Sequence, residues 1–159
     1  MKRTALVCSL ILAMAVAVTA AAPGPQKGKT VPRDISGVMD GRFTFGATTT
    51  GDVEGTLSHL GLSQMYTEHA IDYETFEISG GEFTIVAANG DQIVGTYTAS
   101  GILAGDWSHM DGTAHFTVTG GTGRFAGASG MFTAGFLEVF DDGYVSAGVT
   151  WNLVGTVRY

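Results

Sequence analysis

Residues 144–158 read YVSAGVTWNLVGTVR, and this stretch decides the fold class. Apolar side chains take every second position over most of it, from Val145 through Trp151 to Val157, and polar side chains such as Asn152 lie between them. Successive side chains of a β-strand point to opposite faces, so this alternation indicates a strand with one face in a core and the other in solvent. No segment of the chain shows a comparable helical period.

Turn signals place further strands around this one. Asp141-Asp142-Gly143 separates residues 144–157 from the run 131–140, and Asn89-Gly90-Asp91 separates two alternating runs that contain Ile85 and Ile93. Asn-Gly and Asp-Gly pairs tolerate the positive φ angles of a type I′ turn, which is the favoured connection of a two-residue hairpin. Both sites therefore predict β-hairpins.

The spacing of these runs predicts an all-β domain. Roughly eight runs follow one another at intervals of about a dozen residues, which is typical of a sandwich or a closed barrel and not of alternating strands and helices. Glycines inside the runs, such as Gly95, Gly135 and Gly155, suit the sharp bends of a small barrel. We predict an antiparallel barrel of eight strands, with a β-sandwich as the alternative.

The N-terminus has the features of a secretory signal peptide. Lys2 and Arg3 precede an apolar run from Ala5 to Val18, which is too short for a transmembrane helix of about 20 residues, and small residues favour cleavage after Ala20. We predict a signal peptide over 1–20, a flexible linker over 21–34 and a single barrel domain over 35–159. The mature protein would be secreted or periplasmic and would have no membrane span.

Charge argues against a nucleic-acid partner. Removing residues 1–20 leaves six basic residues against fifteen acidic ones, and phosphate binding requires a basic patch. Cys8, the single cysteine, lies in the predicted signal peptide, so the mature chain would contain no disulfide. We expect no cofactor and no metal, because the four histidines lack the spacing of a zinc site.

The glycine-rich stretch 120–130, GGTGRFAGASG, does not match a nucleotide-binding loop. A phosphate-binding loop needs Gly-x-x-x-x-Gly-Lys-Ser/Thr before a helix, and here the flanking segments are strand-like. The structural interpretation is a tight connection in which Phe125 plugs one end of the barrel and Arg124 meets a carboxylate.

Several short pieces resemble the allene oxide cyclase barrel-like group, which includes the plant dirigent proteins and small exported bacterial proteins. The matching pieces are Gly55 with Ser58-His59-Leu60-Gly61, Ala87 to Asp91 with Gly95-Thr96-Tyr97, residues 120–130, and Gly155-Thr156. The resemblance implies an eight-stranded barrel with an inner cavity, and in plant members a trimer that acts on hydrophobic ligands without a cofactor. The polar cavity residues of those members have no counterparts by position here, so no activity carries over.

Three functions remain open at this point. The first is binding of a small hydrophobic ligand inside the barrel; the second is an isomerase or cyclase that uses an interior carboxylate such as Glu68, or His59; the third is a structural or surface-interaction protein with a packed core. A homo-oligomer is compatible with each of them. The candidate ligand-binding residues are His59, Tyr66, Glu68, Tyr97 and Trp151.

Overall fold

The computed structural model describes residues 31–141 and 143–159. The described chain consists of nine β-strands and one short 3-10 helix, η1. The elements are β1 (Pro32–Thr44), β2 (Thr49–Leu57), β3 (Gly61–His69), β4 (Ile71–Asp72), β5 (Glu77–Val86), β6 (Gln92–Leu103), β7 (His109–Gly121), η1 (Gly123–Phe125), β8 (Ser129–Phe140) and β9 (Ser146–Arg158).

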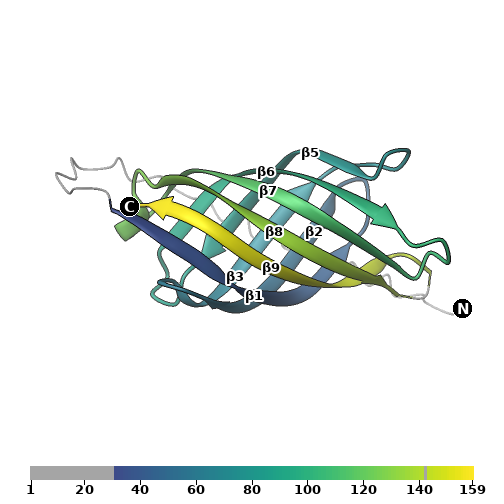
Figure 1. The fold of residues 1–159 in the computed structure, drawn as a ribbon, viewed down its shortest axis with the longest axis horizontal. Coiled ribbons are helices and arrows are strands. Elements are labelled where there is room, and N and C mark those ends of the chain that lie inside the picture. Colours follow the sequence, from purple (N-terminus) through teal and green to yellow (C-terminus); the bar gives the residue numbers. More distant parts are fainter. Residues whose placement is uncertain (1–30, 142) are drawn as a thin grey trace, which may run out of the picture.

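Eight of the strands form a closed antiparallel barrel. The strand order is β3-β2-β1-β9-β8-β7-β6-β5-β4, and an additional pairing of β3 with β5 closes the sheet on itself. β4, two residues long, pairs only with β5 and lies outside the closed circuit. The predicted eight-stranded barrel is therefore confirmed and the sandwich alternative is wrong, because closure leaves one continuous sheet (Figure 1).

The barrel has two different ends, which we name by their connections. The open end carries the connections 45–48, 104–108 and 141–145 and the segment 70–76, which includes β4. The closed end carries the connections 58–60 and 87–91 and the segment 122–128, which includes η1. In Figure 1 the C-terminus lies at the closed end, and the β6–β7 and β8–β9 connections lie at the opposite end.

Aromatic side chains fill the middle of the barrel. The alternation predicted for the last strand is confirmed for Ala147, Val149, Trp151, Leu153 and Val157 of β9, which are all buried. Val145, the first position of the predicted pattern, instead precedes β9 and is 64% exposed. The ring of Phe116 stacks on those of Tyr97 and Phe132 at centroid distances of 5.0 and 4.6 Å, and it also contacts Trp151 at 5.1 Å. The interior at this level is thus a packed core.

Interior glycines make room for these rings. A Cβ atom on Gly112 would lie 2.2 Å from Cζ of Phe136, and a Cβ on Gly81 would lie 2.5 Å from Cε1 of Tyr97. Real Cβ atoms essentially never make contacts this short. Some of the glycines inside strands therefore provide space for large side chains from other strands.

The predicted hairpins form, but the turn at Asn89-Gly90 is not of type I′. Gly90 has a φ of +85°, whereas Asn89 is not among the residues with positive φ. The amide of Gly90 donates to the carbonyl of Ala87, and the amide of Ala87 donates to the carbonyl of Asp91. A turn followed by one left-handed glycine is the three-residue type of hairpin loop, so the strands are joined by a longer connection than the Asn-Gly pair indicated.

The glycine-rich connection closes one end of the barrel, as its sequence predicted. Phe125 of η1 is completely buried, and its ring meets the edge of Tyr159 at a centroid distance of 4.6 Å. Arg124 lies 4.0 Å from the carboxylate of Asp91, and its guanidinium also donates to the carbonyl of His59 at 3.1 Å. Hydrogen bonds from the Arg124 amide and the Asn89 side chain hold the pKa of Asp91 below its ordinary value.

The predicted signal peptide, 1–20, and most of the predicted linker lie outside the described residues. The last three linker positions, Pro32 to Asp34, instead begin β1 and pair with residues 156–158 of β9. Proline is compatible with the first residue of a strand, where its missing N–H breaks no ladder bond. No helix long and apolar enough to cross a membrane occurs in residues 31–141 and 143–159.

Candidate functional site

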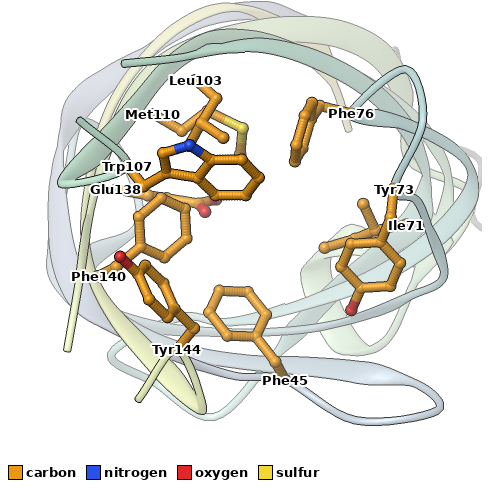
Figure 2. Close-up of a pocket in the computed structure, with 10 residues that line it drawn as sticks. All are labelled: Phe45, Ile71, Tyr73, Phe76, Leu103, Trp107, Met110, Glu138, Phe140 and Tyr144. Carbon is orange, nitrogen blue, oxygen red and sulfur yellow. The ribbon is translucent and has the colours of Figure 1, made fainter. Parts of the chain in front are cut away.

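A cavity of about 360 Å³ lies at the open end of the barrel, above the aromatic core. Nine of its ten lining side chains are apolar or aromatic, and the tenth is a carboxyl group. The lining residues are Phe45, Ile71, Tyr73, Phe76, Leu103, Trp107, Met110, Glu138, Phe140 and Tyr144. Figure 2 shows them around an open centre, with Phe76, Ile71 and Tyr73 facing Trp107, Phe140 and Tyr144.

The connections of the open end supply most of the rim. Phe76 precedes β5, Trp107 lies between β6 and β7, and Tyr144 lies between β8 and β9. All three have positive φ angles, of +54°, +62° and +55° respectively. Bulky side chains rarely adopt this conformation, which costs roughly 1–3 kcal/mol for each residue and concentrates at functional sites. Three strained connections thus hold aromatic rings around one cavity.

The aromatic rim is only partly covered by the protein. Tyr73, Trp107 and Tyr144 are 62%, 56% and 56% exposed, although each is a large ring at a concave surface. The ring of Phe140 contacts Tyr144 and Phe45 at 5.9 Å between centroids. Exposed aromatic rings that surround a cavity are typical of ligand-binding sites.

Glu138 is the polar group of the cavity. It lies on the inner face of β8 between Phe136 and Phe140, and its side chain is only 3% exposed. Its Oε2 atom makes no hydrogen bond with the described residues. Burial raises the pKa of Glu138 from 4.5 to about 7, because an apolar environment disfavours the charged form.

A second polar group lies inside the barrel, next to the aromatic core. The hydroxyl of Tyr97 hydrogen-bonds Nδ1 of His69, and the two rings meet edge to face at 5.7 Å between centroids. Burial lowers the pKa of His69 to about 4 and raises that of Tyr97 well above its ordinary value. The Thr67 hydroxyl lowers the pKa of Tyr97 and the charge of Glu138 raises it, and both effects are smaller than that of burial. Oγ1 of Thr67 makes no hydrogen bond of normal geometry with the described residues.

These pKa shifts make the hydrogen bond one between two neutral groups. Tyr97 keeps its proton and His69 is neutral at physiological pH, so the tautomer of His69 decides which of the two donates. Nε2 of His69 has no hydrogen-bond partner among the described residues. Nε1 of Trp151 is a further buried donor with no partner in that part of the chain.

The five residues predicted from sequence lie in three different places. Tyr97 and Trp151 point into the barrel, but they belong to the packed core and do not line the cavity. Tyr66 and Glu68 point outward from β3, because the buried positions of that strand are Ser63, Met65, Thr67 and His69. His59 lies in the connection between β2 and β3 at the closed end. An enzyme that uses Glu68 or His59 inside the barrel is therefore excluded by their positions.

Glu138 and His69 were not among the predicted site residues, although the period of their strands contains both. Met65, Thr67 and His69 occupy alternate positions of β3, and Phe136, Glu138 and Phe140 do so in β8. The signal at Glu138 was ambiguous because Leu137 and Val139 are apolar too and could equally have faced the core. They face outward instead, with 41% and 51% of their surface exposed.

Acidic residues occur at the open end of the barrel. Asp72 ends β4, and Glu74, Asp106 and Asp141 belong to the connections of that end. Hydrogen bonds from Ser108 keep the pKa of Asp106 below its ordinary value, and a hydrogen bond from Ser146 does the same for Asp141. Arg42, near the end of β1, forms an ion pair with Asp141. The described residues contain no group of three or more acidic, histidine or cysteine side chains that could hold a metal ion.

Comparisons of the chain with protein-family models, with curated proteins and with solved structures found no match.

Proposed function

We propose that this protein is an exported barrel that binds a small, largely apolar molecule in the cavity at its open end. The observation that carries the proposal is the combination of an apolar cavity of about 360 Å³ with one buried carboxyl group, Glu138. Small-molecule sites are typically concave and apolar, contain a few polar groups that orient the ligand, and span ~300–1,000 Å³.

The strain in the rim supports binding over a purely structural role. A barrel that only needed to close its connections could use glycine or asparagine where φ is positive, as it does at Gly90 and Gly143. Phe76, Trp107 and Tyr144 instead place large rings there, and two of these rings remain more than half exposed. The cost in backbone energy is offset if the rings contact a ligand.

Blocking the cavity tests this function. Leu103 lines the cavity, and the adjacent Ile102 is 80% exposed on the outer face of the same strand. Leu103→Trp would fill the cavity, whereas Ile102→Trp adds the same group outside and serves as the matched control. We expect native mass spectrometry of protein purified from the exported fraction to show a co-purifying small molecule with the wild type and with Ile102→Trp, but not with Leu103→Trp.

The unfolding transition of each variant checks that its barrel is intact. Equal ligand occupancy in wild type and Leu103→Trp would contradict binding in this cavity. If native mass spectrometry finds no co-purifying molecule, a fluorescence titration that follows Trp107 with apolar probes is the second measurement, and absence of any saturable change would refute the proposal.

A second candidate function is acid–base catalysis by Glu138. A carboxyl group with a pKa of about 7 inside an apolar cavity can donate and accept protons near neutral pH, which suits an isomerase or cyclase that needs no cofactor. This role predicts that Glu138→Gln abolishes turnover of a bound substrate and preserves its binding. If Glu138→Gln leaves turnover intact, the catalytic role is refuted.

A further inference from the structure

The charge of Glu138 has no counter-ion in the described protein. The basic side chains of that part of the chain are Arg33, Arg42, Arg124 and Arg158. Arg42 pairs with Asp141, Arg124 pairs with Asp91, and Arg33 lies over the ring of Tyr159. Arg158 ends β9 at the closed end, opposite the cavity. An ionised carboxylate buried without a partner is strongly unfavourable, so this site favours either a proton or a cation that arrives with the ligand.

The aromatic rim provides a second feature that favours a cation. Six of the ten lining residues carry aromatic rings: Phe45, Tyr73, Phe76, Trp107, Phe140 and Tyr144. The faces of such rings are electronegative, and each attracts a cation within about 6 Å by ~0.5–2 kcal/mol. Rings that surround a cavity from several sides, as in Figure 2, form the kind of cage that proteins use for alkylammonium groups.

The charges at the open end also favour a cationic ligand. None of the ten lining residues is basic, and the open end carries Asp72 at the end of β4 and Glu74 and Asp106 in its connections. Clusters of one sign around a cleft raise the local concentration of ligands of opposite charge. A carboxylate or phosphate ligand would meet repulsion at the mouth and again at Glu138.

We infer that the cavity selects a hydrophobic organic cation, with an amine or alkylammonium group against Glu138 and an apolar body among the six rings. This inference rests on the proposed ligand-binding function and specifies the chemical class of the ligand. A neutral apolar ligand would leave Oε2 of Glu138 without a partner, and a primary ammonium group would donate to it.

Three probes that share one apolar group separate the two proposals: 3-phenylpropylamine, 3-phenylpropan-1-ol and 3-phenylpropanoate. Isothermal titration calorimetry at pH 8, where Glu138 is ionised, should give an amine affinity at least tenfold higher than that of the alcohol, with the carboxylate weakest. Glu138→Gln should lower the affinity for the amine at least tenfold and change that for the alcohol less than threefold. Glu68→Gln, which changes a carboxylate on the outer wall, should leave all three affinities unchanged.

A second variant keeps the inference testable if Glu138→Gln does not fold. Trp107→Leu retains an apolar side chain and removes a ring face, so it should lower the affinity for the amine more than the affinity for the alcohol. Binding of the alcohol or the carboxylate as tightly as the amine, with no effect of Glu138→Gln, would overturn the cation inference and leave ligand binding standing. Binding of none of the three probes at millimolar concentration would overturn both.

Discussion

His69 and Glu138 are both almost completely buried inside the barrel, yet burial moves their pKa values in opposite directions. The pKa of His69 falls from 6.5 to about 4, and the pKa of Glu138 rises from 4.5 to about 7. Between pH 4.5 and 6.5 both side chains are therefore neutral in the folded protein and charged in the unfolded chain. The folded and the unfolded state therefore each bind one proton at these two side chains, on Glu138 in the folded state and on His69 in the unfolded state.

This relationship predicts that the pH dependence of stability is hidden in the wild type. His69 alone would make the free energy of unfolding rise by about 3 kcal/mol from pH 4 to 6.5, because the unfolded chain binds the extra proton there. Glu138 alone would make it fall by about 3 kcal/mol from pH 4.5 to 7, because the folded state binds the extra proton. The two slopes cancel where they overlap.

Urea unfolding at several pH values tests the cancellation. We expect Glu138→Gln to expose the rise due to His69, and His69→Gln to expose the fall due to Glu138. The double variant, which lacks both groups, should again show little dependence between pH 4.5 and 6.5. Parallel profiles for the wild type and both single variants would show that these two groups do not titrate as their burial implies.

The barrel could be predicted from sequence because its signals are local. Alternation in residues 144–158 and the turn residues around Gly90 and Gly143 specify strands and hairpins without reference to distant parts of the chain. Closure of β3 on β5 brings together segments whose pairing no local pattern specifies, and it was expected from the number of strands and their glycines. The plug at Phe125 was predictable because a bulky apolar residue stands among glycines.

The candidate site could not be predicted because it depends on which face of a strand points inward. Residues 136–140 of β8 are apolar on both faces, so alternation alone does not assign Glu138 to the interior. The exposed aromatic residues of the rim lie in turns, where composition predicts polar side chains. The chemistry of Tyr66 and Glu68 favours both as site residues, but the register of β3 places both on the outer face of the barrel.

Gly112 provides a test of how closely the interior is packed. We expect Gly112→Ala to lower the free energy of unfolding by about 1–3 kcal/mol, because its Cβ would lie 2.2 Å from Phe136 and 2.4 Å from the carbonyl oxygen of Ser100. Gly135→Ala is the matched control in β8, where nothing lies within 4 Å of the new Cβ. Equal stability of the two variants in urea would mean that the core adapts easily around Phe136.

The closed end offers a comparison of two left-handed glycines. Gly123 and Gly127 have φ angles of +53° and +76°, but only a Cβ on Gly123 would collide with Asp91, at 1.8 Å. Gly127→Ala should lower the free energy of unfolding by about 1 kcal/mol, from backbone strain alone. Gly123→Ala should lower it further, and combining Gly123→Ala with Asp91→Ala should recover part of the difference in stability. No recovery in thermal unfolding would contradict the role of the Asp91 contact.

The strained backbone conformation at Trp107 can be compared with the same conformation at His59, which lies away from the cavity. Trp107 and His59 have nearly equal φ angles of +62° and +63°, at the open and closed ends respectively. Asparagine tolerates this conformation better than either residue. We therefore expect the free energy of unfolding of Trp107→Asn to remain within about 1 kcal/mol of the wild type, because relief of backbone strain offsets part of the lost ring contact. His59→Asn should be slightly more stable than the wild type.

Only the variant at the cavity should affect binding. Calorimetry with 3-phenylpropylamine should show at least a tenfold loss of affinity for Trp107→Asn and no change for His59→Asn, because His59 lies at the opposite end of the barrel. If Trp107→Asn lost about 3 kcal/mol of stability, as a core truncation does, and bound the amine normally, the tryptophan would be a structural part of the β6–β7 connection. A large loss of affinity with little loss of stability would show that the strained conformation is maintained for the ligand.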